Sequence, residues 1–340
     1  MHAELPPDQT TRAVLEVLAG IPVDRVAAHA DMDPADVADA VEVYHAAGQA
    51  ALQAHAASRD WFAVRIQPPD WDTAEHAAAT HLCPQLQQAQ ATGVLAAWWF
   101  IRKHPCWRLR LHPGPTATIT QLEVVFSTIL DSLTVAGVLD RWWTASYEPE
   151  VLAFGGPKAM AIAHDLFHAD SSSILDYLRH QDVAARLEDV LGRRELSVLL
   201  CSALFRAAGQ DWYEQGDIWH RVAQTRPVPA GIPTARLPDI AEDLRRLLTV
   251  DTGQLLAPDG PLGFAAPWAT GFRDAGRDLA DAAQRGVLLR GVRDVLAHHV
   301  IFHWNRLGLS ATTQAILARA ARDAVMTPPR TPTRPAEDGR

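Results

Sequence analysis

Two arginines that alternate along one segment are the first candidates for chemistry in this sequence. In CWRLRLHP, Arg108 and Arg110 are two residues apart, so an extended strand places both guanidinium groups on one face, near Arg102. Guanidinium groups are planar, permanently charged forks that bind carboxylates or polarised carbonyls. The alternative interpretation is an ordinary solvated sheet face.

A second candidate is the segment DWYEQGDIW at 211–219. Tyr213 and Asp217 are four residues apart, so on a helix they share a face and the phenol can donate to the carboxylate. Such a pair supplies a polarised hydroxyl that can exchange a proton with an amide, and Glu214 adds a further carboxylate. Trp212 and Trp219 are seven apart and form a stripe, a spacing more typical of core than of a ligand platform.

Two histidine pairs have helical spacing, His164 with His168 and His299 with His303. Neither is accompanied by a third ligand or an HExxH pattern, so we expect packing histidines and no metal. Phosphate-binding glycine loops and the GxSxG elbow are missing from the sequence, and its three cysteines are widely spaced. We therefore expect no cofactor.

Composition and charge limit the partners. The chain has 340 residues, 31 basic and 40 acidic side chains, and a net charge of −9. This balance argues against nucleic acid as a partner. No apolar run is long enough to cross a bilayer and the start does not resemble a secretory signal, so we expect a cytoplasmic protein without a membrane partner.

The hydrophobic pattern predicts an α+β fold with three parts. Residues 1–57 read as an acidic appendage of three short helices, a core follows at 58–326, and the polar tail 327–340 is expected to be disordered. Within the core we expect a small, mostly antiparallel sheet covered by many helices. Its strands are predicted at 61–67, 95–103, 106–113 and 139–147. Its helices are predicted near 73–92, 118–136, 157–168, 171–180, 193–208, 210–224, 238–249, 270–285, 288–307 and 310–325.

Five segments in this order resemble the elimination domain of lantibiotic dehydratases, also called the thiopeptide-type bacteriocin biosynthesis domain. They are WFAVRIQ, AAWWFIRKHPCWRLRL, YEPEVLAFGGPKAMAIAHDLFHADSSSIL, DWYEQGDIW and VLAHHVIFHWNRLGLS. The resemblance covers most of residues 60–325. It implies either removal of glutamate from glutamylated Ser or Thr, or condensation of two dehydroalanines into a pyridine.

Departures from the eliminase pattern separate these two chemistries. Arg108 and Arg110 match its strand arginines. Its E-x-x-R-Y-G-G turn reads EVLAFGG here, which puts Ala153 at the arginine, and its C-terminal helix has Ile301 at the histidine. Neither side chain can move a proton or stabilise an enolate. His303 stands two residues away from the histidine position, a rotation of about 200° on a helix.

The resemblance therefore favours a thiopeptide pyridine synthase acting on a ribosomal precursor peptide, with contacts to other pathway enzymes possible. The expected catalytic residues are Tyr213, Asp217 and Glu214. The expected substrate-binding residues are Arg102, Arg108, Arg110, Glu150, Trp212, His303 and Trp304. Three alternatives remain open: a stand-alone glutamate eliminase, a cyclase-like enzyme with another peptide modification, and a non-catalytic precursor-binding scaffold.

Overall fold

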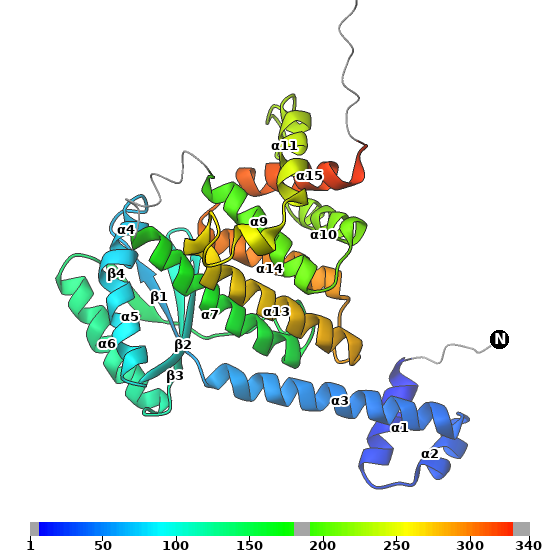
Figure 1. Cartoon of the computed structure of the whole chain (residues 1–340). Helices are drawn as coiled ribbons and strands as arrows, with labels where there is room; N and C mark the ends of the chain where they lie inside the picture. The colour runs from blue at the N-terminus through cyan, green and yellow to red at the C-terminus, as the bar shows by residue number, and fades with distance from the viewer. Residues whose placement is uncertain (1–6, 180–190, 329–340) are drawn as a thin grey trace, which may run out of the picture. The chain divides into compact units, whose positions relative to one another are not determined.

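The computed structural model describes residues 7–179 and 191–328, and the chain divides into two compact units, Met1–Ser58 and Arg59–Arg340 (Figure 1). Nearly all of the predicted tail, 327–340, lies outside the described residues. Within the described part, no helix is both long enough and apolar enough to span a bilayer.

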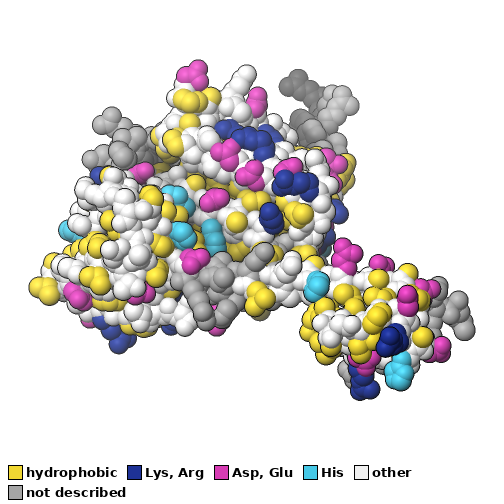
Figure 2. Space-filling view, turned by 90° about the horizontal axis from the view of Figure 1, so that it is seen from below, with side chains coloured by type: hydrophobic (Ala, Val, Ile, Leu, Met, Phe, Trp, Pro, Cys, Tyr) yellow, Lys and Arg dark blue, Asp and Glu magenta, His cyan; other side chains and the backbone are white. Residues whose placement is uncertain are grey.

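The first unit consists of α1 (Pro7–Leu18), α2 (Val23–Ala30) and α3 (Pro34–Arg59). The Asp33 carboxylate accepts a hydrogen bond from the Ala35 backbone N–H at 2.8 Å, which satisfies one of the free donors at the start of α3. A small core holds the helices together and consists of Ala13, Val26, Ala27 and Val37. Hydrophobic and acidic side chains share the surface of this unit (Figure 2), among them the exposed Leu15, Val43 and Tyr44.

The second unit contains a four-stranded antiparallel sheet in the order β2-β3-β1-β4. The strands are β1 (Phe62–Gln67), β2 (Leu95–Lys103), β3 (Cys106–Pro113) and β4 (Arg141–Thr144). The first three match the prediction from alternating hydrophobicity. β4 is shorter than predicted, because the chain leaves the sheet after Thr144 and crosses one sheet face as the loop 145–156.

The two faces of the sheet have different coverings. Phe62, Val64 and Ile66 of β1 point with Leu109 and its neighbours into the main core, against α5 (Cys83–Ala91) and α6 (Ile119–Val135). The opposite face carries Trp99, Arg108 and Arg110 and meets the helical layer formed with α7 (Pro157–Arg179) and α14 (Val292–Leu307) (Figure 1). The strand arginines therefore face the helical half of the unit.

The helical half fits the predicted α+β class. Its longer helices are α7 (Pro157–Arg179), α9 (Arg193–Ala207), α10 (Trp212–Thr225), α11 (Leu237–Thr249), α13 (Ala266–Gln284), α14 (Val292–Leu307) and α15 (Ala311–Met326). Short helices are α4 (Ala74–Ala77), a π-turn (Ala78–Leu82), α12 (Thr252–Leu255) and a 3-10 turn (Gly263–Ala265).

The predicted break between helices 157–168 and 171–180 is wrong, since α7 runs through it. Short polar side chains such as those of Asp170 and Ser171 can compete with a helix for backbone hydrogen bonds. Here both side chains are buried and bond to other elements: Ser171 Oγ accepts from the Phe100 N–H, and Asp170 binds groups on α13 and α14. The helical backbone therefore stays intact.

Candidate functional site

A cavity of about 390 Å³ lies between the arginine-bearing face of the sheet, the loop 145–156, and helices α7, α10 and α14. This volume falls in the range of small-molecule and peptide-segment sites. Its lining combines five cations, two carboxylates and an aromatic wall. The lining residues are Trp99, Ile101, Arg102, Lys103, Arg108, Arg110, Tyr147, Glu148, Glu150, Phe154, Met160, Phe167, Thr225, Arg226, His298, Ile301, Phe302 and Asn305.

Arg110 is a buried cation of this cavity, with 7% of its surface exposed. Its guanidinium lies 5.2 Å from the ring centroids of both Trp99 and Tyr147. Its Nε has no hydrogen-bond partner among the described residues, and its Nη1 contacts only the Leu109 carbonyl at 3.4 Å. Burial lowers the pKa of Arg110 to about 10, because the charged form loses water. An anion or carbonyl oxygen bound in the cavity would restore that missing interaction.

Tyr147 and His164 form a hydroxyl–imidazole pair beside Arg110. The Tyr147 Oη lies 2.6 Å from His164 Nε2, and the Tyr147 ring is edge-on to Trp99. Burial raises the pKa of Tyr147 and lowers the pKa of His164 to about 4, so both groups are neutral at pH 7. Tyr147 comes from the loop after β4, and His164 from the first half of α7.

Glu150 and His298 form a second proton-carrying pair on the cavity wall. Glu150 Oε2 lies 2.8 Å from His298 Nε2. The hydrogen bond from His298 lowers the pKa of the Glu150 carboxyl. His298 lies on α14 one turn before Ile301, which lines the same cavity. The cavity wall thus combines the apolar side chain of Ile301 with the imidazole of His298 one helical turn away.

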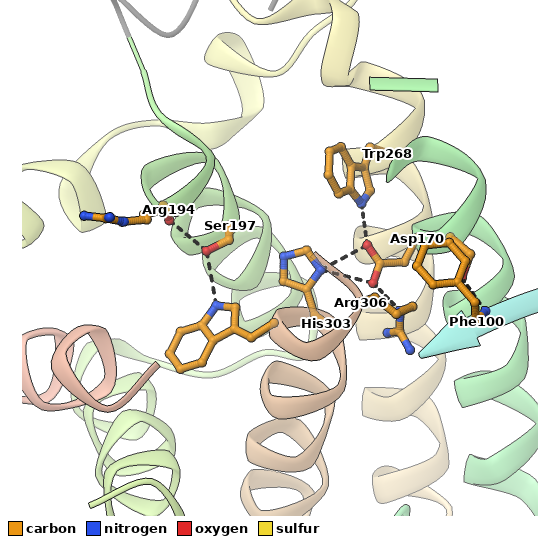
Figure 3. Close-up of polar contacts among 9 residues, drawn as sticks. Phe100, Asp170, Arg194, Ser197, Trp268, His303 and Arg306 are labelled. Atoms are coloured by element: carbon orange, nitrogen blue, oxygen red, sulfur yellow. Dashed lines mark hydrogen bonds and ion pairs between the residues drawn. The ribbon is translucent and has the colours of Figure 1, made fainter. Parts of the chain in front are cut away.

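His303 faces away from the cavity, as its rotation from Ile301 predicts. Its Nδ1 bonds to both carboxylate oxygens of Asp170, at 3.0 and 3.1 Å, in the interior between α7, α13 and α14 (Figure 3). The Trp268 indole N–H and Arg306 Nε also donate to Asp170, at 2.8 and 2.6 Å. All four side chains are buried, so His303 belongs to the packing of the helices.

Trp304 is also an interior residue. It is fully buried, its ring stacks on Trp219 with centroids 5.9 Å apart, and its indole N–H donates to Ser197 Oγ at 3.1 Å. Trp212 is half-buried against the same core. The structure therefore places these two tryptophans and His303 outside the cavity lining, whereas Arg102, Arg108, Arg110 and Glu150 are part of it.

The predicted catalytic set lies at the other end of α10 from the cavity. In this region only Thr225 and Arg226, at the C-terminal end, line the cavity. The twelve helical steps from Tyr213 to Thr225 span about 18 Å. Tyr213 is 69% exposed. Asp217 pairs with Arg221 at 3.0 Å and Arg293 at 3.2 Å, and Glu214 closes the capping box that starts α10.

Sequence reasoning missed Tyr147, His164, Arg226 and His298. The sequence indicated His164 only as half of a histidine pair with metal-ligand spacing. In the structure its hydrogen-bonding partner is Tyr147, 17 positions earlier in the chain. Tyr147 was visible as one of four tyrosines, in the matching segment YEPEVLAFGG, and could have been singled out there. Arg102 was expected at the substrate; it lines the cavity but also forms an ion pair with Glu75.

Comparison with known proteins gives one family. The family model for the lantibiotic biosynthesis dehydratase C-terminal region matches residues 61–325. No curated protein sequence matches the chain.

Three solved structures have a similar fold. The tRNA-dependent lantibiotic dehydratase MibB from Microbispora sp. 107891 is 18% identical with a TM-score of 0.55, over 78% of this chain and 28% of MibB. TsrL is 18% identical with a TM-score of 0.52, over 78% of this chain and 95% of TsrL. The pyridine synthase TbtD from thiomuracin biosynthesis is 14% identical with a TM-score of 0.53, over 78% of this chain and 97% of TbtD. The similarity extends over nearly the full length of TsrL and TbtD, but over less than a third of MibB.

Proposed function

The chain belongs to the lantibiotic biosynthesis dehydratase C-terminal family, and from this membership we propose that it is a pyridine synthase. Its substrate is a ribosomal precursor peptide that already carries two dehydroalanines. The observation that carries the proposal is that Ile301 lines the cavity at the position where the eliminase pattern has a histidine. The two strand arginines of that pattern, Arg108 and Arg110, are kept and line the same cavity. Full-length similarity to the pyridine synthase TbtD supports it.

The reaction joins two alkenes without an oxidant. One dehydroalanine and its preceding amide tautomerise to an iminol, which makes a 2-azadiene. Two C–C bonds then form, from its alkene CH₂ to the CH₂ of the second dehydroalanine and from the iminol carbon to that residue's α-carbon. Loss of water and of the leader peptide as a carboxamide leaves the aromatic pyridine. The protein must orient the two alkenes and move protons at the amide.

The two proton-carrying pairs of the cavity suit the tautomerisation. With Nε2 protonated, His164 donates to Tyr147 Oη, which leaves the phenol O–H to donate to the amide oxygen. With its Nε2–H directed at Glu150, the His298 imidazole presents Nδ1 as the acceptor of the amide proton. Arg110 would stabilise the negative charge that develops on the amide oxygen.

Glutamate elimination is the second candidate, and His298 is the observation that favours it. An imidazole oriented by Glu150 in a cavity with Arg108 and Arg110 is a base of the kind that removal of an α-proton needs. However, the His298 imidazole lies one helical turn from Ile301, the position of the eliminase histidine. Ala153 stands at the position of the arginine in the eliminase turn, and its methyl side chain supplies no cation there.

Mass spectrometry of the products separates the candidates. The purified protein is incubated with a dehydrated, azole-bearing precursor and, separately, with a glutamylated precursor. A pyridine synthase gives a cyclic product together with free leader carboxamide. Loss of glutamate would identify an eliminase, another mass change would identify another modification, and no mass change with retained precursor binding would identify a scaffold.

A further inference from the structure

Four cationic side chains lie on four successive strands of the sheet, on the face that borders the cavity. They are Lys103 on β2, Arg108 on β3, Arg65 on β1 and Arg141 on β4, hereafter the basic strip. Arg108 lies directly opposite Arg65, and Arg65 directly opposite Trp143. The Arg141 guanidinium lies 5.1 Å from the Trp143 ring centroid.

No residue of the basic strip has a carboxylate within ion-pair distance, 4.0 Å, among the described residues. Arginines elsewhere in the second unit are commonly paired, as Arg221 is with Asp294 and Arg285 with Asp281. Like charges directly opposite each other on adjacent strands are destabilising. Glu150, which lines the cavity, interacts electrostatically with Lys103 and Arg108 and offsets part of their charge. A net acidic protein that keeps Arg65 opposite Arg108 thus concentrates positive charge without a direct ion pair at one place.

The basic strip continues from the cavity onto accessible surface. Lys103 and Arg108 line the cavity. Arg65 is half-buried and Arg141 is exposed, with its Nε donating to Gln67 Oε1 at 3.1 Å. Next to the strip, the buried Arg110 Nε lacks a partner among the described residues. An anionic chain that enters the cavity can therefore extend outward over three strand spacings, about 14 Å.

We infer that the basic strip binds an acidic segment of the precursor peptide while the reacting segment occupies the cavity. A length of about 14 Å matches four or five residues of extended chain, so two to four carboxylates can meet four cations. Nucleic acid fits this surface less well, because phosphate tracking needs many contacts and the protein's net charge is −9. That the bound acidic segment belongs to a precursor peptide rests on the proposed function. The preference of the basic strip for carboxylates does not rest on it.

Binding of a defined peptide to full-length protein tests the inference. The probe is a fluorescein-labelled, extended 12-residue peptide with four Glu alternating with Ser and Gly, measured by fluorescence anisotropy at low salt. The comparison peptide has Gln for every Glu. The strip variant is Arg65→Gln/Arg141→Gln, whose positions lie outside the cavity lining. The control variant, Arg277→Gln/Arg285→Gln, removes the same charge from exposed positions of α13.

We expect the Glu peptide to bind wild type and the control variant equally, and the strip variant at least tenfold more weakly. The Gln peptide should bind all three weakly. Equal affinity for both peptides, or equal weakening in both variants, would overturn the inference. Tighter binding of a bulk tRNA probe that the strip substitutions abolish would assign the surface to nucleic acid instead, and would also overturn it.

Failure of this inference can be distinguished from failure of the proposed pyridine synthase function. If the protein forms no pyridine but prefers the Glu peptide through the strip, the inference survives alone. If it forms pyridine and the strip variant shows unchanged affinity and unchanged turnover of the full precursor, the inference fails alone. Circular dichroism of each variant confirms that the compared proteins are folded.

Discussion

The Tyr147 hydroxyl lies 2.6 Å from His164 Nε2, on the wall of a cavity that also contains the buried guanidinium of Arg110. Neither residue was expected to act from the sequence, which instead indicated Tyr213 and Asp217. Burial holds both members of the pair neutral at pH 7. The pair therefore offers neutral hydrogen-bonding groups beside the Arg110 guanidinium, which lies 5.2 Å from the centroid of the Tyr147 ring.

Replacing Tyr147 and Tyr213 separately by phenylalanine tests which of them takes part in the reaction. We expect Tyr147→Phe to lower pyridine formation on the order of 100-fold, a typical loss for a general acid. Tyr213→Phe should retain wild-type rates, because Tyr213 is exposed about 18 Å along α10 from the cavity. Single-turnover mass spectrometry measures both. A defect confined to Tyr213→Phe would support the assignment made from the sequence.

Arg110→Gln should separate stability from function. The charge is desolvated and lacks a carboxylate partner among the described residues, so removing it should leave the melting temperature unchanged or raised. Product formation should fall on the order of 100-fold, as for loss of one oxyanion donor. A large fall in melting temperature would show instead that Arg110 has a structural role.

Asp170→Asn should destabilise the second unit by about 3–5 kcal/mol, because it leaves Arg306 as an unpaired buried cation. Arg306→Met in the same chain should recover part of this loss by removing that cation. All eleven tryptophans lie after residue 60, so tryptophan fluorescence during urea unfolding reports on the second unit. A double variant less stable than Asp170→Asn would contradict this explanation.

His299 should make stability depend on pH. It is 1% exposed, packs on Phe154 and lies near Arg306, His298 and Asp170, and burial lowers its pKa from 6.5 to about 3. Between these values the unfolded chain binds a proton that the folded chain does not. Stability attributable to His299 is therefore complete above pH 6.5 and decreases as the pH falls toward 3, by about 1.4 kcal/mol per pH unit.

The measurement is the slope of unfolding free energy against pH between 4.5 and 6. His299→Leu should reduce that slope by about 1.4 kcal/mol per pH unit. His81→Leu, at an exposed position, is the control and should leave the slope unchanged. Equal slopes in wild type and His299→Leu would show that His299 is not buried as a neutral group.

The sequence by itself determined most elements of the fold. Alternating residues specified β1, β2 and β3, because a strand exposes its side chains to two faces in turn. The helices predicted at 210–224 and 310–325 are present, and in the structure Asp211 and Ser310 cap their starts. The same alternation put Arg108 and Arg110 on one face, and helical rotation separated His303 from Ile301. These are local rules, since each depends on residues a few positions apart.

Only the tertiary structure decided which side chains share the cavity. Glu150 and His298 are 148 positions apart in the chain, and Tyr147 meets His164, behind the cavity wall, across 17 positions. No helical or strand spacing records either contact. The buried Asp170 kept α7 continuous because its partners are on α13 and α14. The Tyr213–Asp217 spacing was correct for a helix, but α10 directs only its opposite end toward the cavity. Distance along the chain predicts a shared face, whereas packing between elements determines a shared site.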